Sequence, residues 1–381
     1  MIGNQDKDIK EIEAMELIDQ AEILIDKGEG EKALKLYEKA AQIYLDVGGY
    51  IKLDQIYIRI AKIISQFKDN IQAALRLESI TRKTEELKLY EISAKLLMHS
   101  ANIAYKIHDW ETAGEKWQRA ASYFHEADPE EYHKLTSFLL LKAGQSFERS
   151  RLTKDEGKRL ILQAVMKTSK FDELYELEEK RGYDLLKREE FDAAANKFRD
   201  IANYFKKALD NMGEIIDEEE YSETYLNTKA RFIHFIAEYL AITAFCLRVS
   251  ESRAHNEKIK ELSIESIDLF KKSIMLLKDY LLSQKADFDR EILMRITFDI
   301  MMLSIVQAMI GVHQTNPNKF LLENCEKNEV LIKKLKQTPY YTITERIEKI
   351  GIVDALSDIL KVNLGHFEKI KNTLISFFLK K

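Results

Sequence analysis

The amino-acid sequence predicts an all-α protein, built as a right-handed solenoid of antiparallel helical hairpins followed by a C-terminal helical bundle. Proline occurs 3 times and glycine 13 times in 381 residues, which favours long uninterrupted helices over turn-rich β architectures. Hydrophobic residues make up 45% of the chain, enough for a sizeable core. A repeat with a period of forty residues indicates the solenoid.

Residues 94–124 show the repeating unit most clearly, as two amphipathic helical patterns joined by a short polar turn. The first pattern draws an apolar stripe at three-and-four spacing. Asp109 is the expected N-cap of a second helix that begins at Trp110. Because the turn is so short, the two helices must lie antiparallel and share their stripes.

The turn and second helix of this unit recur along the chain. Their first-position alanines are Ala33, Ala73 and Ala113, and a further copy follows at Ala194. The copy expected near residue 154 is divergent. We therefore expect about five helical hairpins between residues 15 and 205, each covering a face that its predecessor leaves exposed.

Three regions follow from this pattern: the solenoid over residues 1–209, an acidic junction over 210–221 and the bundle over 222–381. Within the bundle, long helical patterns are expected over residues 222–251, 256–285, 288–313, 318–337 and 342–380. Pro317 and Pro339 lie between them, where helices break or begin.

Two stretches of the bundle are apolar almost all round, residues 292–312 and 232–247. The first is long enough to cross a bilayer but contains Arg295 and Asp299, each costing roughly 2.5–3.5 kcal/mol at a membrane centre. These two residues are four apart and can pair on one helix face, and His234 and Glu238 share that spacing. We interpret both stretches as central helices of a soluble bundle.

Charge and cysteine usage limit the function classes further. A net charge of −5 argues against a general nucleic-acid binder, which would need a strongly basic domain. Cys246 and Cys325 form no metal-type spacing and suit a reducing cytoplasm. The N-terminus has no apolar run of the secretory type, so we expect a cytoplasmic protein.

The alanine–aromatic–alanine signature of Ala113, Trp117 and Ala120 resembles the tetratricopeptide (TPR) family, whose consensus period is 34. The longer hairpins, with the segments DWETAGEKWQRAA (109–121) and KAGQSF (142–147), resemble the soluble NSF attachment proteins (SNAPs) over about residues 15–205. This resemblance implies a non-enzymatic adaptor in vesicle trafficking. Its concave face would hold a SNARE-like helical bundle, and its C-terminal bundle would contact an AAA ATPase.

Two groups of residues are candidates for partner binding. Lys95, Asn102 and Lys106 lie on the first helix of the clearest hairpin. A basic cluster lies in the divergent fourth hairpin and could attract an acidic partner; it consists of Arg149, Arg151, Lys154, Lys158 and Arg159. The alternative for the cluster is a solvated turn.

The C-terminal tip combines aromatic, aliphatic and basic side chains in Phe377, Phe378, Leu379, Lys380 and Lys381. Such a mix is typical of a membrane-interface or partner-docking segment. The alternative is a last helix that packs onto its own bundle.

Other classes of site remain as alternatives. One is a generic TPR-like peptide-binding scaffold, and another is a ligand sensor with a pocket around His234, Glu238, Arg295 and Asp299. A divalent metal site in the acidic, histidine-containing turn at 125–133 is disfavoured by its spacing. The glycine pattern at residues 28–33 resembles a dinucleotide fingerprint but follows a helix instead of a strand. No sequence motif nominates a catalytic residue or a cofactor.

Overall fold

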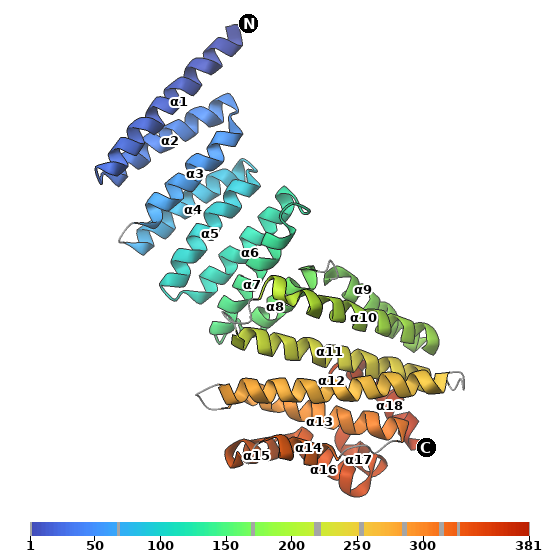
Figure 1. Cartoon of the computed structure of the whole chain (residues 1–381). Helices are drawn as coiled ribbons and strands as arrows, with labels where there is room; N and C mark the ends of the chain where they lie inside the picture. Colours follow the sequence, from blue (N-terminus) through green and yellow to red (C-terminus); the bar gives the residue numbers. More distant parts are fainter. Residues whose placement is uncertain are drawn as a thin grey trace. The chain divides into compact units, whose positions relative to one another are not determined.

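The computed structural model describes residues 2–66, 69–168, 172–216, 222–250, 255–283, 288–311, 316–325 and 328–380. Within these ranges every regular element is a helix, and the helices pack as sequential antiparallel pairs (Figure 1). The predicted all-α class is confirmed, and the chain is an all-helical repeat protein. It divides into two compact units, Met1–Ala164 and Val165–Lys381.

The first unit contains seven helices and most of an eighth within the described residues. They are α1 (Ile2–Asp26), α2 (Gly30–Val47), α3 (Tyr50–Ser65), α4 (Asn70–Glu86), α5 (Tyr90–Lys106), α6 (Trp110–Ala127), α7 (His133–Arg149) and α8 (Lys154–Thr168), which contains the unit boundary. Each helix packs against its neighbour along the chain, and α3 also packs against α5.

The forty-residue repeat is visible in the core. Ala33, Ala73 and Ala113 are fully or almost fully buried in α2, α4 and α6. The next repeat position, one turn on, is filled by Tyr37, Leu77 and Trp117, all of which are buried. Small and large side chains therefore alternate along the same face of each second helix, which lets neighbouring helices interdigitate.

Helix ends repeat as well. Asp69 and Asp109 cap α4 and α6 by accepting hydrogen bonds from backbone amides of the first turn, which confirms the predicted N-cap at Asp109. Gly48 ends α2 with a φ of 74°, and Lys88 has a φ of 57° forty residues later. The backbone conformation thus follows the repeat even where glycine is absent.

Ion pairs join successive hairpins of the first unit. Arg76 of α4 reaches Glu31 and Glu38 of α2 at 2.9 and 3.3 Å. Lys95 of α5 contacts Asp54 of α3 at 2.8 Å. Each pair is partly exposed, so it contributes at most about 1 kcal/mol; its larger effect is to fix which surface positions lie opposite one another.

The second unit begins with α9 (Asp172–Lys187) and α10 (Phe191–Asn211), followed by the 3-10 turn η1 (Met212–Glu214). Its long helices are α11 (Ser222–Val249), α12 (Asn256–Ser283) and α13 (Arg290–Ile310). Ser266 and Ser273 of α12 donate hydrogen bonds to carbonyls of α11 at 2.8 and 3.3 Å. These small side chains bring the two helices close together.

The unit ends in short elements, namely α14 (Pro317–Asn324), α15 (Glu329–Lys336), α16 (Pro339–Ile350), α17 (Ile352–Ile359), the 3-10 helix η3 (Gly365–Ile370) and α18 (Lys371–Leu379). The expectation of one helix over 342–380 is therefore wrong. Gly351 and Gly365 have φ values of 86° and 58°, which a continuing helix cannot contain. The segment 318–337 is likewise two helices, because Asn328 caps a new one.

The compact units do not divide at the predicted boundary, residue 209. The repeat copy at Ala194 lies in α10, which packs against α11 within the second unit. The assignment of residues 1–209 to a solenoid and 222–381 to a bundle stays a prediction. Residues 217–221 of the predicted acidic junction lie outside the described residues.

In the part of the chain that the structure describes, two helices are long and apolar enough to cross a membrane by length and composition, Glu223–Val249 and Arg290–Ile310. In each, 83% of the most apolar window is buried inside the protein. This burial agrees with the interpretation of both as central helices of the second unit.

Gly144 of α7 and Gly157 of α8 lie against each other. A Cβ atom at Gly144 would lie 2.7 Å from the Gly157 carbonyl oxygen, and one at Gly157 would lie 2.6 Å from the Gly144 carbonyl oxygen. We expect Gly144→Ala and Gly157→Ala each to lower the free energy of unfolding by about 1–3 kcal/mol, because the helices must move apart. Denaturant unfolding measures this.

Gly213→Ala is the matched control, because nothing lies within 4 Å of a Cβ atom at that position. We expect it to change stability by no more than about 0.5 kcal/mol. Equal effects at all three glycines would contradict the close approach of α7 and α8.

Candidate functional sites

The three predicted partner-binding residues of α5 have different surroundings. The Lys95 ammonium contacts Asp54 at 2.8 Å and Glu91 at 2.6 Å. Asn102 and Lys106 are exposed. The charge of Lys95 is therefore already compensated within the protein, and this part of the first-helix face offers less to an acidic partner than the sequence suggests.

The basic cluster of the fourth hairpin is largely paired locally. The Arg149 guanidinium lies 4.8 Å from the Trp110 ring centre and 5.0 Å from that of Tyr105. Lys158 and Arg159 pair with carboxylates one turn away on their own helix, at 3.3 and 2.5 Å. Arg151 is exposed, and Lys154 begins α8 half-buried. Arg149 thus serves packing between hairpins.

A groove of about 420 Å³ lies between α4 and α6, with α5 as its floor. It is on the side of these hairpins that their second helices form. Its α4 rim carries Glu78, Arg82 and Glu85, its α6 rim carries Glu115, Lys116 and Arg119, and its floor contains Leu97 and Ser100. One ion pair, Arg119 with Glu85 at 2.5 Å, crosses the groove from α6 to α4. A second, Arg82 with Glu78 at 2.8 Å, lies along the α4 rim.

The corresponding gap between α2 and α4 is bridged. There Arg76 joins Glu31 and Glu38. Forty residues later, Ile71 occupies the position of Glu31 and Lys116 occupies that of Arg76. The same two-carboxylate bridge cannot form between α4 and α6, because Ile71 replaces one carboxylate. Glu78 keeps the position of Glu38 but pairs with Arg82, and Arg119 with Glu85 joins the two helices instead.

Lys116 turns toward the floor of the groove. Its ammonium donates a hydrogen bond to the Ser100 hydroxyl at 2.6 Å, and the residue forty positions before Ser100 is the buried Ile60, which could not accept one. Burial lowers the pKa of Lys116, although the negative charges of Glu78, Asp109 and Glu115 act to raise it. Among the described residues no carboxylate forms an ion pair with Lys116.

The predicted C-terminal tip is partly core. Phe378 is 2% exposed, and the Phe377 ring meets that of Phe245 edge to face with centroids 5.8 Å apart. Leu379 is 65% exposed and Lys380 is exposed as well, while Lys381 lies outside the described residues. The two phenylalanines thus pack within their own unit, as the alternative expected, and only Leu379 and Lys380 are left for docking.

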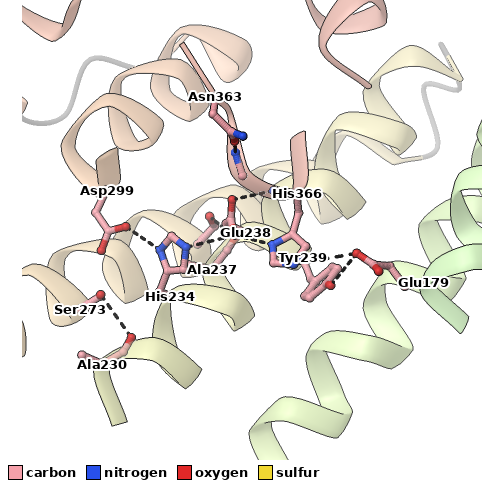
Figure 2. Close-up of polar contacts among 12 residues, drawn as sticks. Glu179, Ala230, His234, Ala237, Glu238, Tyr239, Ser273, Asp299, Asn363 and His366 are labelled. Carbon is pink, nitrogen blue, oxygen red and sulfur yellow. Dashed lines mark hydrogen bonds and ion pairs between the residues drawn. The ribbon is translucent and has the colours of Figure 1, made fainter. Parts of the chain in front are cut away.

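A chain of buried acidic and basic groups crosses the second unit (Figure 2). His234 of α11 lies between two carboxylates, with Nδ1 2.6 Å from Asp299 of α13 and Nε2 3.1 Å from Glu238. Glu238 also contacts Nδ1 of His366, on η3, at 2.5 Å. Nε2 of His366 is 3.9 Å from Glu179 on α9. Carboxylates and imidazoles therefore alternate across four elements.

The carboxylates and imidazoles of this buried chain determine one another's protonation. Burial alone would lower the pKa of His234, but the carboxylates of Asp299 and Glu238 raise it to about 10. Burial would likewise raise the pKa of Glu238, but His366 and His234 hold it well below its usual range. At neutral pH the centre of the chain is therefore an imidazolium between carboxylates.

The chain fastens the C-terminal segment to the helices. The His366 amide and ring both contact Glu238, and the Tyr183 hydroxyl of α9 donates to the His366 carbonyl at 2.7 Å. A Cβ atom at Gly365 would collide with the Glu238 carboxylate. Each of these side chains has a partner inside the protein, although Oδ2 of Asp299 is buried without a hydrogen bond. We assign this chain a structural role.

The predicted pairing of these residues was half right. His234 and Glu238 do pair along α11. Asp299, however, contacts His234 and not Arg295, whose guanidinium donates to Asn227 at 2.7 Å. His366 and Glu179 were missed, because nothing in the local sequence places them beside α11.

The other two alternatives can be located as well. Among the described residues no three His, Cys, Asp or Glu side chains are grouped to hold a metal ion. In the acidic turn at 125–133, Asp128 accepts hydrogen bonds from the amides of Glu130 and Glu131. The glycine-containing turn at 28–30 joins α1 to α2, two helices, and so lacks the strand that a dinucleotide fingerprint needs.

Comparison with known proteins leaves the family open. No family model matches the chain, and no curated protein matches it. A solved structure described as a circular tandem repeat protein with novel repeat topology and enhanced subunit contact surfaces aligns with 96% of this chain and 87% of its own. Identity is 14% and the TM-score is 0.26, values that support no conclusion about family or function.

The buried chain predicts a pH dependence of stability. Because the folded pKa of His234 is about 10 and its ordinary value is 6.5, its contribution is complete below pH 6.5 and is lost as the pH rises toward 10. We expect the free energy of unfolding to fall between pH 6.5 and about 10, by at most about 1.4 kcal/mol per pH unit. His234→Gln should remove this slope, and an unchanged slope would contradict the assignment.

A double-mutant cycle tests the pairing itself. His234→Gln leaves Asp299 and Glu238 buried without the cation between them, so we expect a loss of about 3–5 kcal/mol. Adding Asp299→Asn should cost less than the sum of the single changes. Hydrogen exchange in α11 measures the effect. Fluorescence of Trp110 and Trp117, both in α6, is the control and should not change; additive losses would contradict the pairing.

Proposed function

We propose that this protein is a non-enzymatic adaptor that binds a protein partner through its helical repeats. One observation carries the proposal, namely the groove between α4 and α6, where the two-carboxylate bridge that Arg76 forms in the preceding repeat is absent and Arg119 with Glu85 is the described ion pair that crosses the gap. A repeat protein needs only its core positions to stack. Ile71, Ser100 and Lys116 differ from their counterparts Glu31, Ile60 and Arg76 in the preceding repeat, and the proposal rests on these departures.

Exposed aliphatic side chains that precede the groove along α4 support a protein partner. Ile71 and Leu75 are 67% and 63% exposed and lie one turn apart on α4. They continue the line of Glu78 and Arg82, which lie on the rim of the groove, because residues three and four apart share a helix face. Two adjacent exposed aliphatic side chains beside a charged groove suit a protein segment of mixed character.

A finer version follows from the resemblance to attachment proteins. In this version the adaptor is cytoplasmic and acts in membrane trafficking, holds a SNARE-like helical partner and links it to an AAA ATPase. The tip residues Leu379 and Lys380 would then supply peripheral membrane contact. A generic TPR-like scaffold, which binds a peptide with its C-terminal unit dispensable, is the second version. A ligand sensor in the second unit is disfavoured by the paired state of His234 and Glu238.

Closing the groove tests the proposal. Ile71→Glu with Lys116→Arg restores the residue types that bridge α2 and α4, so we expect partner capture to fall about tenfold or more while the helical content stays unchanged. Capture from the host lysate by the full chain, quantified by mass spectrometry against this double variant, measures it. Glu31→Gln, which changes only the closed gap, is the control.

The identity of the captured proteins separates the versions. Membrane-anchored helical proteins or an AAA ATPase, captured by the original chain and lost from the double variant, would support the attachment-protein version. Recovery of neither would contradict that version. Capture that is equal for the original chain and the double variant would contradict the groove as the binding site.

A further inference from the structure

Lys116 is an unusual basic residue for this surface. Its side chain is half-buried, and its described hydrogen-bond partner is a hydroxyl. The other cations that line the groove, Arg82 and Arg119, each pair with a carboxylate. Withdrawing an ammonium from water costs free energy that a hydroxyl repays only in part. A carboxylate delivered to the groove would repay it more fully.

The groove itself supplies no such carboxylate. Glu78 pairs with Arg82, and Glu85 pairs with Arg119. Glu115 is exposed on the same helix as Lys116, and neighbouring positions of a helix point in different directions. Lys116 is therefore the position where a carboxylate from outside the chain gains most.

We infer that the groove between α4 and α6 binds an acidic segment of a partner protein, with a partner carboxylate on Lys116 and an apolar side chain of the same segment on Ile71 and Leu75. This inference rests on the proposed adaptor function and specifies the chemistry of the partner. The carboxylate shares or replaces the bond from Lys116 to Ser100. The apolar contact covers the aliphatic pair that remains exposed in the free protein.

Comparison of the two repeats explains why an external carboxylate is expected to bind between α4 and α6 and not between α2 and α4. Between α2 and α4, the carboxylates of Glu31 and Glu38 already pair with Arg76, so an external carboxylate would have to displace one of them from this cation. Between α4 and α6, Ile71 removes one of these carboxylates, and the Ser100 hydroxyl keeps the ammonium in place. The same three changes therefore remove the bridge of the preceding repeat and leave the Lys116 ammonium hydrogen-bonded to a hydroxyl, with the nearest described negative charges farther off than an ion pair.

Peptide selection tests the inference with a defined probe. A random peptide library displayed on phage is selected against the full chain and counter-selected against the Ile71→Glu, Lys116→Arg double variant. Enriched peptides are synthesised, and each Asp or Glu is changed to Asn or Gln. Fluorescence anisotropy then gives Kd for the original chain, for Lys116→Met and for Lys116→Gln.

The expected result is a set of peptides with one acidic residue whose amide variant binds the original chain about 10–100-fold more weakly. The same change should alter Kd less than about twofold with Lys116→Met or Lys116→Gln. Neither substitution leaves a buried carboxylate unpaired, because Lys116 forms no described ion pair. Circular dichroism verifies that both variants fold. Ser100→Ala, which keeps the lysine, should bind these peptides at least as well as the original chain.

Two other results would overturn the inference. Peptides that need the open groove but show the same acid-to-amide effect with and without Lys116 would leave the proposed function standing and refute the role of Lys116. Peptides that bind the double variant as well as the original chain would refute the groove, and with it both the inference and the proposed function.

Discussion

The spacing between successive hairpins is the constraint on which the first unit depends. It is set by small buried side chains at fixed repeat positions, of which Ala33, Ala73 and Ala113 are the clearest. Because these alanines are equally buried at intervals of forty residues, residues forty positions apart lie at corresponding places on successive second helices. A substitution at a surface position can then be compared directly with its counterpart one repeat away, as Ile71 can with Glu31.

Charge is used in opposite ways in the two units. In the second unit, Glu238 lies between His234 and His366, and each ionised group has an opposite charge beside it. Such a chain fastens elements together, and removing His234 leaves Asp299 buried without an opposite charge. In the first unit, Lys116 has a hydroxyl where its repeat counterpart has two carboxylates. An incomplete arrangement of this kind is suited to binding.

Local signals of the sequence were sufficient for the helices, the period and the cap at Asp109, because each depends on residues within one or two turns. The C-terminal breaks were not predicted, since the left-handed backbone at Gly351 and Gly365 is one of several conformations that glycine allows. The partner of Asp299 was also missed. Its contact with His234 joins two helices that are distant in sequence, and spacing along one helix cannot reveal it.

The groove could have been found from sequence by aligning the gap positions instead of the core positions. Core positions recur because packing requires them, so they identify the fold and say little about binding. The departures at Ile71, Ser100 and Lys116 are visible only once the register of the repeat is known. By contrast, Lys95 was predicted to bind a partner because the sequence does not show that it pairs with Asp54, which lies on another helix.

Site-specific photocrosslinking tests the central claim most directly. A photoreactive phenylalanine analogue at position 71 should crosslink the partner, because Ile71 is exposed on the same face of α4 as Glu78, which lines the groove. The same analogue at position 31, its repeat counterpart beside the closed gap, should not. Equal crosslinking at both positions, or crosslinking only at position 31, would contradict the account of a groove specialised for binding.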